Sequence, residues 1–175
     1  PRATWISASG IEMATRAEIR RATRADVPVV LELIHALASY EKLAHLVQAG
    51  EALLEDQLFS EASPAETLLC TVDGAAVGFA VFFHNFSTFM GRKGLYLEDL
   101  FVRPEHRGRG YGKALLLHVA RIAHQRGCGR FEWMVLDWNA PSIRFYEALG
   151  AQRMDEWRLF RVTGDALAAL ARQDG

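Results

Sequence analysis

The chain has 175 residues, half of them hydrophobic, which suits one domain with a substantial core. Its 20 basic and 21 acidic residues leave a net charge of −1, so no general positive field attracts nucleic acid or an anionic membrane. No apolar run is long enough for a membrane span and no signal peptide opens the chain, which predicts a cytoplasmic protein with a small-molecule partner.

The first part of the chain predicts two helices and a hairpin after a patternless start. Residues 1–17 look like an extension, so we expect a single domain over residues 18–175. Apolar residues at helical spacing follow a run that resembles a capping box, and Asp73-Gly74 is a strong hairpin signal. The expected elements are, in chain order, a short strand at Ile19, a helix from Thr23–Asp26 toward Tyr40–Glu41, a helix over 51–59, and strands over 67–72 and 77–83.

The second part of the chain alternates strands and helices. Gly127 and Gly150 are placed to end two of the helices. We therefore predict a mixed α/β fold with helices around a central sheet. The expected elements are a strand over 95–102, a helix over 113–126, a strand over 130–137, a helix started by Asn139 and Pro141, a strand over 157–162 and a short helix from about Asp165.

A glycine-rich run, Arg107-Gly108-Arg109-Gly110-Tyr111-Gly112, separates the strand over 95–102 from the amphipathic segment 113–126. Alternating glycines leave backbone N–H groups uncovered, and a helix N-terminus adds about half a positive charge. The run lacks the hydroxyl that a Walker loop needs after Gly112-Lys113, and its glycines are too closely spaced for a Rossmann fingerprint. It predicts a cradle for a pyrophosphate group.

Two motifs carry a resemblance to a known family. The pattern Arg-x-x-Gly-x-Gly, after a strand with the acidic pair Glu98-Asp99, resembles the coenzyme A motif of the GCN5-related N-acetyltransferases (GNAT). Residues 138–151, which include Asn139, Ser142 and Tyr146, resemble the distal motif of the same family. Together with Tyr40-Glu41, the match is similar to the diamine (spermidine/spermine) and thialysine N-acetyltransferase branch, from about Glu18 to the C-terminus.

The resemblance implies a GNAT fold, in which a mixed, mostly antiparallel and twisted sheet is flanked by helices. It also implies an acetyl-CoA-dependent enzyme in which a primary amine attacks the thioester directly, without a metal. The histidines are scattered without ligand spacing, which agrees with that expectation. Family members generally pair as homodimers, and the apolar C-terminal strand and helix suit such an interface. The coenzyme-binding residues implied are Leu100, Phe101, Val102, Arg107, Gly108, Arg109, Gly110, Tyr111, Gly112, Lys113, Asn139 and Ser142.

The acceptor amine needs a base, because a primary ammonium has a pKa of about 10.4 and must lose a proton before it attacks. Glu98 is the candidate, since strand alternation would set it beside Tyr96, Leu100 and Val102 in an apolar environment. The resemblance implies a backbone N–H around Leu100 as the oxyanion donor and Tyr146 as the acid that protonates the coenzyme thiolate. The expected acceptor-binding residues are Tyr40, Glu41, Glu98, Glu132, Trp133, Met134 and Glu156.

Each assignment has a structural alternative. Tyr146 can be a packed helix aromatic, Glu98 and Asp99 can face solvent on a half-exposed strand, and Tyr40-Glu41 can simply end a helix. At the level of function, the alternatives are a coenzyme A-binding module that has lost its acceptor chemistry and a protein amine acetyltransferase. Retention of both Glu98 and Tyr146 favours the enzyme.

The kind of acceptor is predicted from a departure from the polyamine enzymes. Aligned with them, Ser87 takes the place of an aspartate and Phe89 that of a tryptophan, whereas the thialysine-acetylating relatives also have Ser-Thr there. A missing carboxylate removes a charge-assisted partner worth about 1.5–3 kcal/mol to an extended polycation. We therefore expect a thialysine-like amino acid or a short diamine to be preferred over spermidine and spermine.

Overall fold

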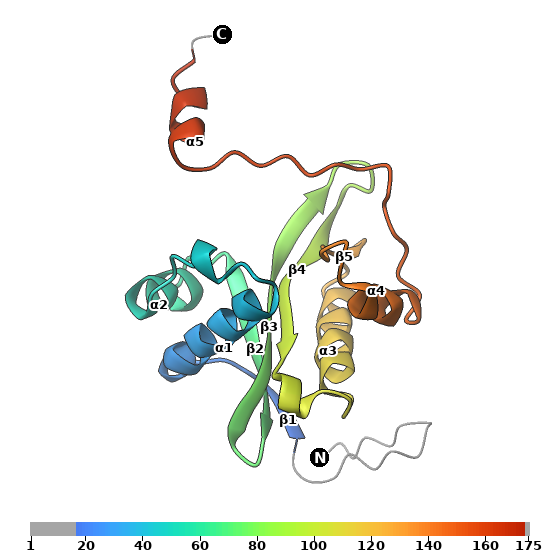
Figure 1. The fold of residues 1–175 in the computed structure, drawn as a ribbon. Coiled ribbons are helices and arrows are strands. Elements are labelled where there is room, and N and C mark those ends of the chain that lie inside the picture. The colour runs from blue at the N-terminus through green and yellow to red at the C-terminus, as the bar shows by residue number, and fades with distance from the viewer. Residues whose placement is uncertain (1–16, 174–175) are drawn as a thin grey trace. The chain divides into compact units, whose positions relative to one another are not determined.

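A five-stranded sheet in the order β1-β2-β3-β4-β5 forms the centre of the chain up to Met134 (Figure 1). The computed structural model describes residues 17–173, so the expected N-terminal extension lies outside the described residues except for Ala17. The first four strands pair antiparallel and β5 pairs parallel with β4, which confirms the predicted mixed, mostly antiparallel sheet. The strands are β1 (Ala17–Arg21), β2 (Ala65–Val72), β3 (Ala75–Ser87), β4 (Arg92–Val102) and β5 (Phe131–Trp133).

The helices lie close to their predicted positions. The backbone N–H of Thr23 donates to Oδ2 of Asp26 at 2.7 Å, as expected of the capping box. None of the helices within residues 17–173 is long and apolar enough to cross a membrane. The α-helices are α1 (Val27–Tyr40), α2 (Glu51–Phe59), α3 (Tyr111–Gln125), α4 (Ala140–Glu147) and α5 (Gly164–Leu170), with short 3-10 turns at Arg24–Asp26, Ala44–Leu46 and Pro104–His106.

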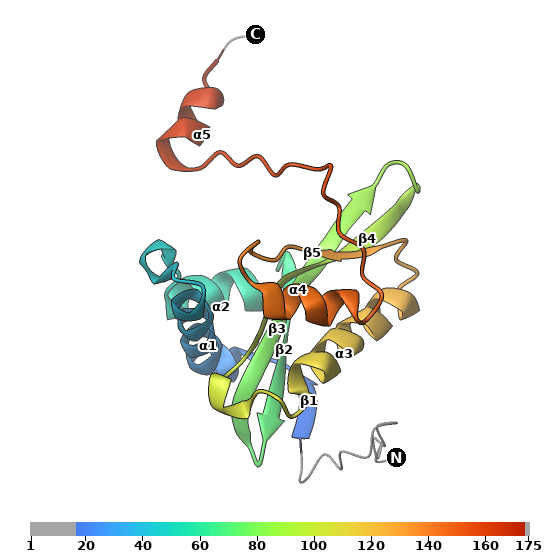
Figure 2. The same cartoon turned by 45° about the vertical axis from the view of Figure 1, so that its right-hand side comes forward.

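The sheet is covered by helices on both faces. Helices α1 and α2 lie on one side of it and α3 lies on the other (Figures 1 and 2). Burial of apolar side chains between these layers stabilises the arrangement, because such area contributes about 25 cal/mol per Å². On the α1 side the fully packed cluster consists of Val30, Leu33, Leu69, Phe79, Val81 and Phe101, and on α3 the buried side chains include Leu115, Leu116 and Val119.

Local turn chemistry fixes the β2–β3 hairpin. Asp73 and Gly74 have φ values of 50° and 86°, the pair of left-handed conformations that a two-residue type I′ turn requires. Aspartate tolerates such a conformation better than most residues and glycine adopts it at no steric cost. The hairpin predicted from this dipeptide is therefore confirmed.

A β-bulge interrupts the pairing of β3 with β4. Phe82 lies opposite Leu97 and Val81 lies opposite Asp99, so Glu98 has no partner on β3. An extra residue of this kind inverts the alternation of faces along the strand that carries it. Since Val81 belongs to the cluster under α1, Asp99 is on the α1 face of the sheet.

Two predicted strands differ from the structure. The strand expected over 130–137 consists only of Phe131–Trp133, and its pairing with β4 ends at Leu97, directly before the bulge. The bulge ends the ladder because it turns the backbone of β4 away from its neighbour. The strand expected over 157–162 does not form, because an isolated apolar segment has no ladder unless another strand pairs with it.

The chain divides into two compact units, one up to Met134 and one from Val135 onward. The first contains the sheet with α1, α2 and α3, and the second contains α4, α5 and the irregular segment between them. In the second unit, α4 ends before Gly150 as predicted, and Gly150 has the positive φ, 91°, that is common just after a helix. The single domain expected over residues 18–175 stays a prediction.

Candidate functional site

The loop between β4 and α3 has the geometry expected of an anion cradle. Gly108 and Gly110 have φ values of 75° and 85°, conformations that L side chains rarely adopt. No other heavy atom lies within 4 Å of the point where a Cβ would stand at either residue, so this face of the loop is open. Helix α3 begins at once, with Gly110 as its N-cap, and its first turn presents N–H groups that have no acceptor within the helix.

This loop fits the pyrophosphate of a coenzyme A. The residues that would hold it are those of the glycine run and the start of α3, through backbone N–H groups rather than through a metal ion. Arg109 within the run and Lys113 directly after it are cationic side chains that can add charge, whereas Arg107 is turned back toward β4. Gly112 differs from the other two glycines, because it lies within α3, where other residues are also allowed.

The environment expected for Glu98 is wrong. Its side chain is exposed, because the bulge removes this residue from the regular alternation that would have set it beside Tyr96, Leu100 and Val102. The role proposed for Glu98 does not depend on burial alone, since an exposed carboxylate can still accept a proton through water. The apolar environment that led to the choice of Glu98 as the base is found instead at the next residue, Asp99.

Asp99 is the carboxylate in the apolar setting. Burial, and then the like charges of Glu98 and Glu41, raise the pKa of Asp99 to about 7. Burial also raises the pKa of Glu41, which directly follows α1 and is partly buried. The charges that act on Asp99 are thus both negative, and two carboxylates in such a setting favour a bound cation.

The other predicted acceptor-binding carboxylates have different surroundings. Glu132 on β5 already pairs with Arg130 at 2.8 Å and accepts a hydrogen bond from Nδ2 of Asn85 at 2.8 Å. Glu156 is exposed in a turn of the second unit. Trp133 is partly buried on β5, whereas the side chain of Met134 is exposed. Besides Glu98, Glu41 is therefore the predicted acceptor residue whose charge acts on Asp99.

The buried side chain at the turn between β3 and β4, that of Ser87, is uncharged. Ser87 is buried, and its hydroxyl accepts a hydrogen bond from the backbone N–H of Met90 at 3.3 Å. Phe89 is 95% exposed at the tip of the same hairpin. Ser87 thus shapes the turn and supplies no negative charge for a distant ammonium.

The second unit holds the predicted distal motif on one helix. Asn139 is the N-cap of α4, and its Oδ1 accepts a hydrogen bond from the backbone N–H of Ser142 at 3.4 Å. Tyr146 lies one turn further along α4, with its ring 5.2 Å from that of Phe145. The three residues are thus carried by one short helix that starts with a proline in its first turn.

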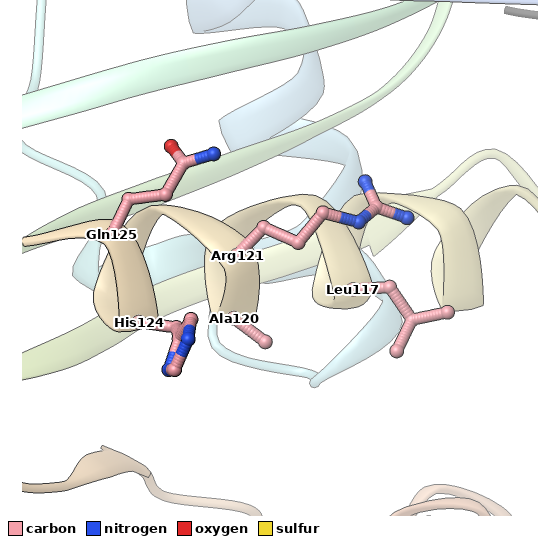
Figure 3. A pocket seen from close by; sticks show the side chains of 5 residues that line it. All are labelled: Leu117, Ala120, Arg121, His124 and Gln125. Carbon is pink, nitrogen blue, oxygen red and sulfur yellow. The ribbon is translucent and has the colours of Figure 1, made fainter.

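An open hollow runs along the outer surface of α3 (Figure 3). Its lining side chains all come from this helix and include none of the predicted site residues. We therefore assign the candidate site to the cradle and to the acidic pair at Asp99 and Glu41. The residues that line the hollow are Leu117, Ala120, Arg121, His124 and Gln125.

Asp99 is the residue that sequence reasoning underestimated. The signal was present as two adjacent acidic residues in an apolar strand, but regular alternation assigns only one of them to the packed face. Whether Glu98 or Asp99 is the more buried depends on the bulge, and no residue type in that part of β3 and β4 indicates a bulge. The strand signal therefore identified the pair and not its buried member.

Comparison with known proteins gives consistent matches over most of the chain. A family model described as the acetyltransferase (GNAT) family matches residues 31–151. An L-ornithine N5-acetyltransferase of Arabidopsis thaliana is 37% identical, with 94% of this chain and 91% of that protein covered. A thialysine N-epsilon-acetyltransferase of Bos taurus is also 37% identical, with 87% and 96% covered. A solved integron cassette protein from the mobile metagenome of V. cholerae has a TM-score of 0.76 and 28% identity, with 90% of this chain and 98% of that chain covered.

Proposed function

The chain belongs to the acetyltransferase (GNAT) family and is an N-acetyltransferase, and we propose that its acceptor is a small molecule with a primary amine, either a thialysine-like amino acid or a short diamine. Acetyl-CoA is the proposed donor. The relatives support the proposed acceptor, since their names describe acetylation of ornithine and of thialysine. They also favour an active enzyme over a coenzyme-binding module without acceptor chemistry.

The acidic pair of Asp99 and Glu41 is the observation that carries the proposal. Burial raises the pKa of both carboxyl groups, which means that each pays a desolvation cost when it is ionised. An ammonium group beside them offsets that cost, because it replaces repulsion between like charges with attraction. A site of this kind selects a cation and not a neutral or anionic acceptor.

The proposed chemistry divides between the cradle, the acidic pair and Tyr146. When bound, the coenzyme supplies an acetyl thioester, which an uncharged amine attacks directly. Asp99 and Glu41 hold the acceptor ammonium, and Asp99 is the better matched proton acceptor, because a pKa of about 7 suits a base at neutral pH. Glu98 offers a second route for the proton through water. Tyr146 holds the proton that the thiolate needs.

The oxyanion donor proposed near Leu100 agrees with the pairing of β4. Beyond Leu97 this strand pairs with β3 alone among the strands of residues 17–173. One edge of the segment from Glu98 to Phe101 therefore has no strand partner, which supports the proposal that a ligand pairs with it. A backbone N–H on such an edge is rigidly held, which suits it to stabilise charge that develops in a transition state.

The preference for a short amine follows from where negative charge is available. The acidic pair can hold one ammonium, but Glu132 is already occupied by Arg130 and Asn85. The hairpin turn around Ser87 has no acidic residue. A long polycation therefore gains little from its distal ammonium groups, although it loses conformational entropy when it is ordered.

An amine panel tests the proposal. We expect thialysine, lysine, ornithine and 1,3-diaminopropane to exceed spermidine and spermine in kcat/KM by about tenfold, the factor that about 1.4 kcal/mol of a missing charge contact gives. Release of free thiol from acetyl-CoA measures the rate, and mass spectrometry identifies the product. A peptide with a free N-terminus is the control for protein acetylation. If spermine is tenfold better than every short amine, the polyamine assignment replaces this one.

We also propose that the protein is a homodimer in which a second copy covers the segment after α4. Trp157, Leu159 and Phe160 are 68%, 65% and 90% exposed, an apolar stretch that is unusual for the surface of a monomer. The segment already has the composition of a strand, and a partner strand would complete it.

Sedimentation velocity at micromolar concentration tests the dimer. We expect a dimer for the native chain and a monomer for Phe160→Asp, because a charge in an apolar interface is strongly unfavourable. The matched control is Gln152→Asp, which adds the same charge at an exposed position outside the apolar stretch. A native chain that sediments only as a monomer contradicts the proposal.

A further inference from the structure

Arg107 has a side chain that contacts α1 rather than the open face of the glycine loop. Its Nε donates to the carbonyl oxygen of Val102 at 2.9 Å. The central carbon of its guanidinium lies 4.2 Å from the ring centroid of Tyr40 and 5.4 Å from that of Phe101. Both distances are within the range of a cation–π interaction. A loop predicted to bind coenzyme is thereby joined to the last residue of α1.

The end of α1 is also the end of the proposed acceptor site. Tyr40 packs against the apolar cluster under α1, and Glu41 follows it immediately. Burial, and then the charges of Glu98 and Glu41, raise the pKa of Asp99, so the carboxyl groups of Glu41 and Asp99 lie within electrostatic range of each other. A contact that holds the Tyr40 ring in one rotamer also fixes the end of α1, and so limits the positions that the carboxylate of Glu41 can take.

We propose that Arg107 is a positioning residue that couples the coenzyme loop to the acceptor site through Tyr40. Binding of the coenzyme at Gly108–Gly110 orders the loop, and the guanidinium then holds Tyr40 and Glu41 in the arrangement that binds an ammonium. Each substrate therefore increases the affinity for the other, since such coupling is reciprocal. The proposal rests on the proposed function, because it concerns the same acceptor site.

The alternative is that Arg107 binds a phosphate of the coenzyme. In that case its removal weakens coenzyme binding, and the acceptor is affected only indirectly. The observed contacts favour the positioning role, because the planar face and one of the five N–H donors of the guanidinium are already used by Tyr40 and Val102, and the variants below test the phosphate role of the other donors. The two roles therefore differ in which affinity falls when Arg107 is replaced: that for the acceptor in the positioning role, and that for coenzyme A in the phosphate-binding role.

Steady-state kinetics and calorimetry of three variants separate the two roles. Arg107→Gln should raise the KM of the acceptor about three- to tenfold, the loss expected for one cation–π contact, and leave the Kd of coenzyme A within about twofold. Arg107→Lys retains the cation over the ring and should restore part of the acceptor KM. Arg109→Gln removes the same charge from the same loop and should instead raise the Kd of coenzyme A. A rise in that Kd for Arg107→Gln that equals the rise in KM overturns the proposal.

A measurement that needs no acceptor tests the coupling directly. The chain has only 4 tyrosines, so ring-labelled tyrosine gives few NMR signals, and Tyr40→Phe identifies the one from Tyr40. Coenzyme A should shift the Tyr40 signal in the native protein and not in Arg107→Gln, although both proteins bind it. A shift that persists in Arg107→Gln, or is absent in the native protein, overturns the coupling. If no amine is acetylated, the proposed function fails, and this NMR result still decides the role of Arg107.

Discussion

Replacing Tyr146 with phenylalanine should lower kcat by about 10²- to 10⁴-fold, while the affinity for acetyl-CoA stays nearly unchanged. The ring of Tyr146 lies 5.2 Å from that of Phe145, and phenylalanine preserves this contact. Only the hydroxyl is lost, so the change removes a proton donor and leaves the packing of α4 in place. The expected effect is therefore on the chemical step.

Measurement of kcat across the pH range, together with calorimetry of coenzyme binding, checks this result. Ser142→Ala on the same helix is the comparison, because it keeps the backbone N–H that Asn139 accepts and so leaves the N-cap intact. A kcat for Tyr146→Phe that stays close to the native value at every pH would mean that another group protonates the thiolate. Tyr146 would then be a structural residue of α4.

Asp99→Asn should reduce kcat/KM by about 30- to 100-fold, because it removes one member of a charged contact with the acceptor worth about 2–3 kcal/mol. Glu98→Gln is the matched variant, with the same change of charge one residue away in the exposed bulge. We expect the smaller loss from Glu98→Gln. The reverse order would restore Glu98 as the residue that binds and deprotonates the acceptor.

The pH dependence of kcat/KM and of stability gives a second test of the role of Asp99. Since burial raises its pKa to about 7, kcat/KM of the native enzyme should increase as pH rises through this value and Asp99 ionises. Asp99→Asn should lack this inflection. The effect on stability has the opposite sign, because the folded state binds the proton more tightly than the unfolded state. Between about pH 4 and 7 the native chain should therefore lose stability with rising pH relative to Asp99→Asn, which thermal unfolding measures.

Elements determined by short-range chemistry were predictable from the sequence. The helix Glu51–Phe59 and the Asp73-Gly74 turn follow from local spacing and from residues that accept positive φ. The glycine run before α3 was equally clear, because few structures require alternating glycines directly before a helix. In each case the signal and its structural cause lie within a few residues of each other.

Features that depend on pairing between distant segments were not predictable. The bulge at Glu98 results from how β3 and β4 align, and this alignment decides which acidic residue is buried. The missing strand over 157–162 has the same origin, because β-rich composition shows that a segment can pair and not which strand it pairs with. The contact of Arg107 with Tyr40 joins residues far apart in sequence and could only be found in the structure.

The bulge in β4 also has a consequence for protein engineering. It separates two consecutive carboxylates into an exposed residue, Glu98, and a partly buried one, Asp99. A library that varies Glu98 therefore explores surface charge, whereas one that varies Asp99 together with Glu41 explores the acceptor site that we propose. Because neither position lies in the glycine loop, new acceptors can be sought by directed evolution while the machinery for the common donor is left intact.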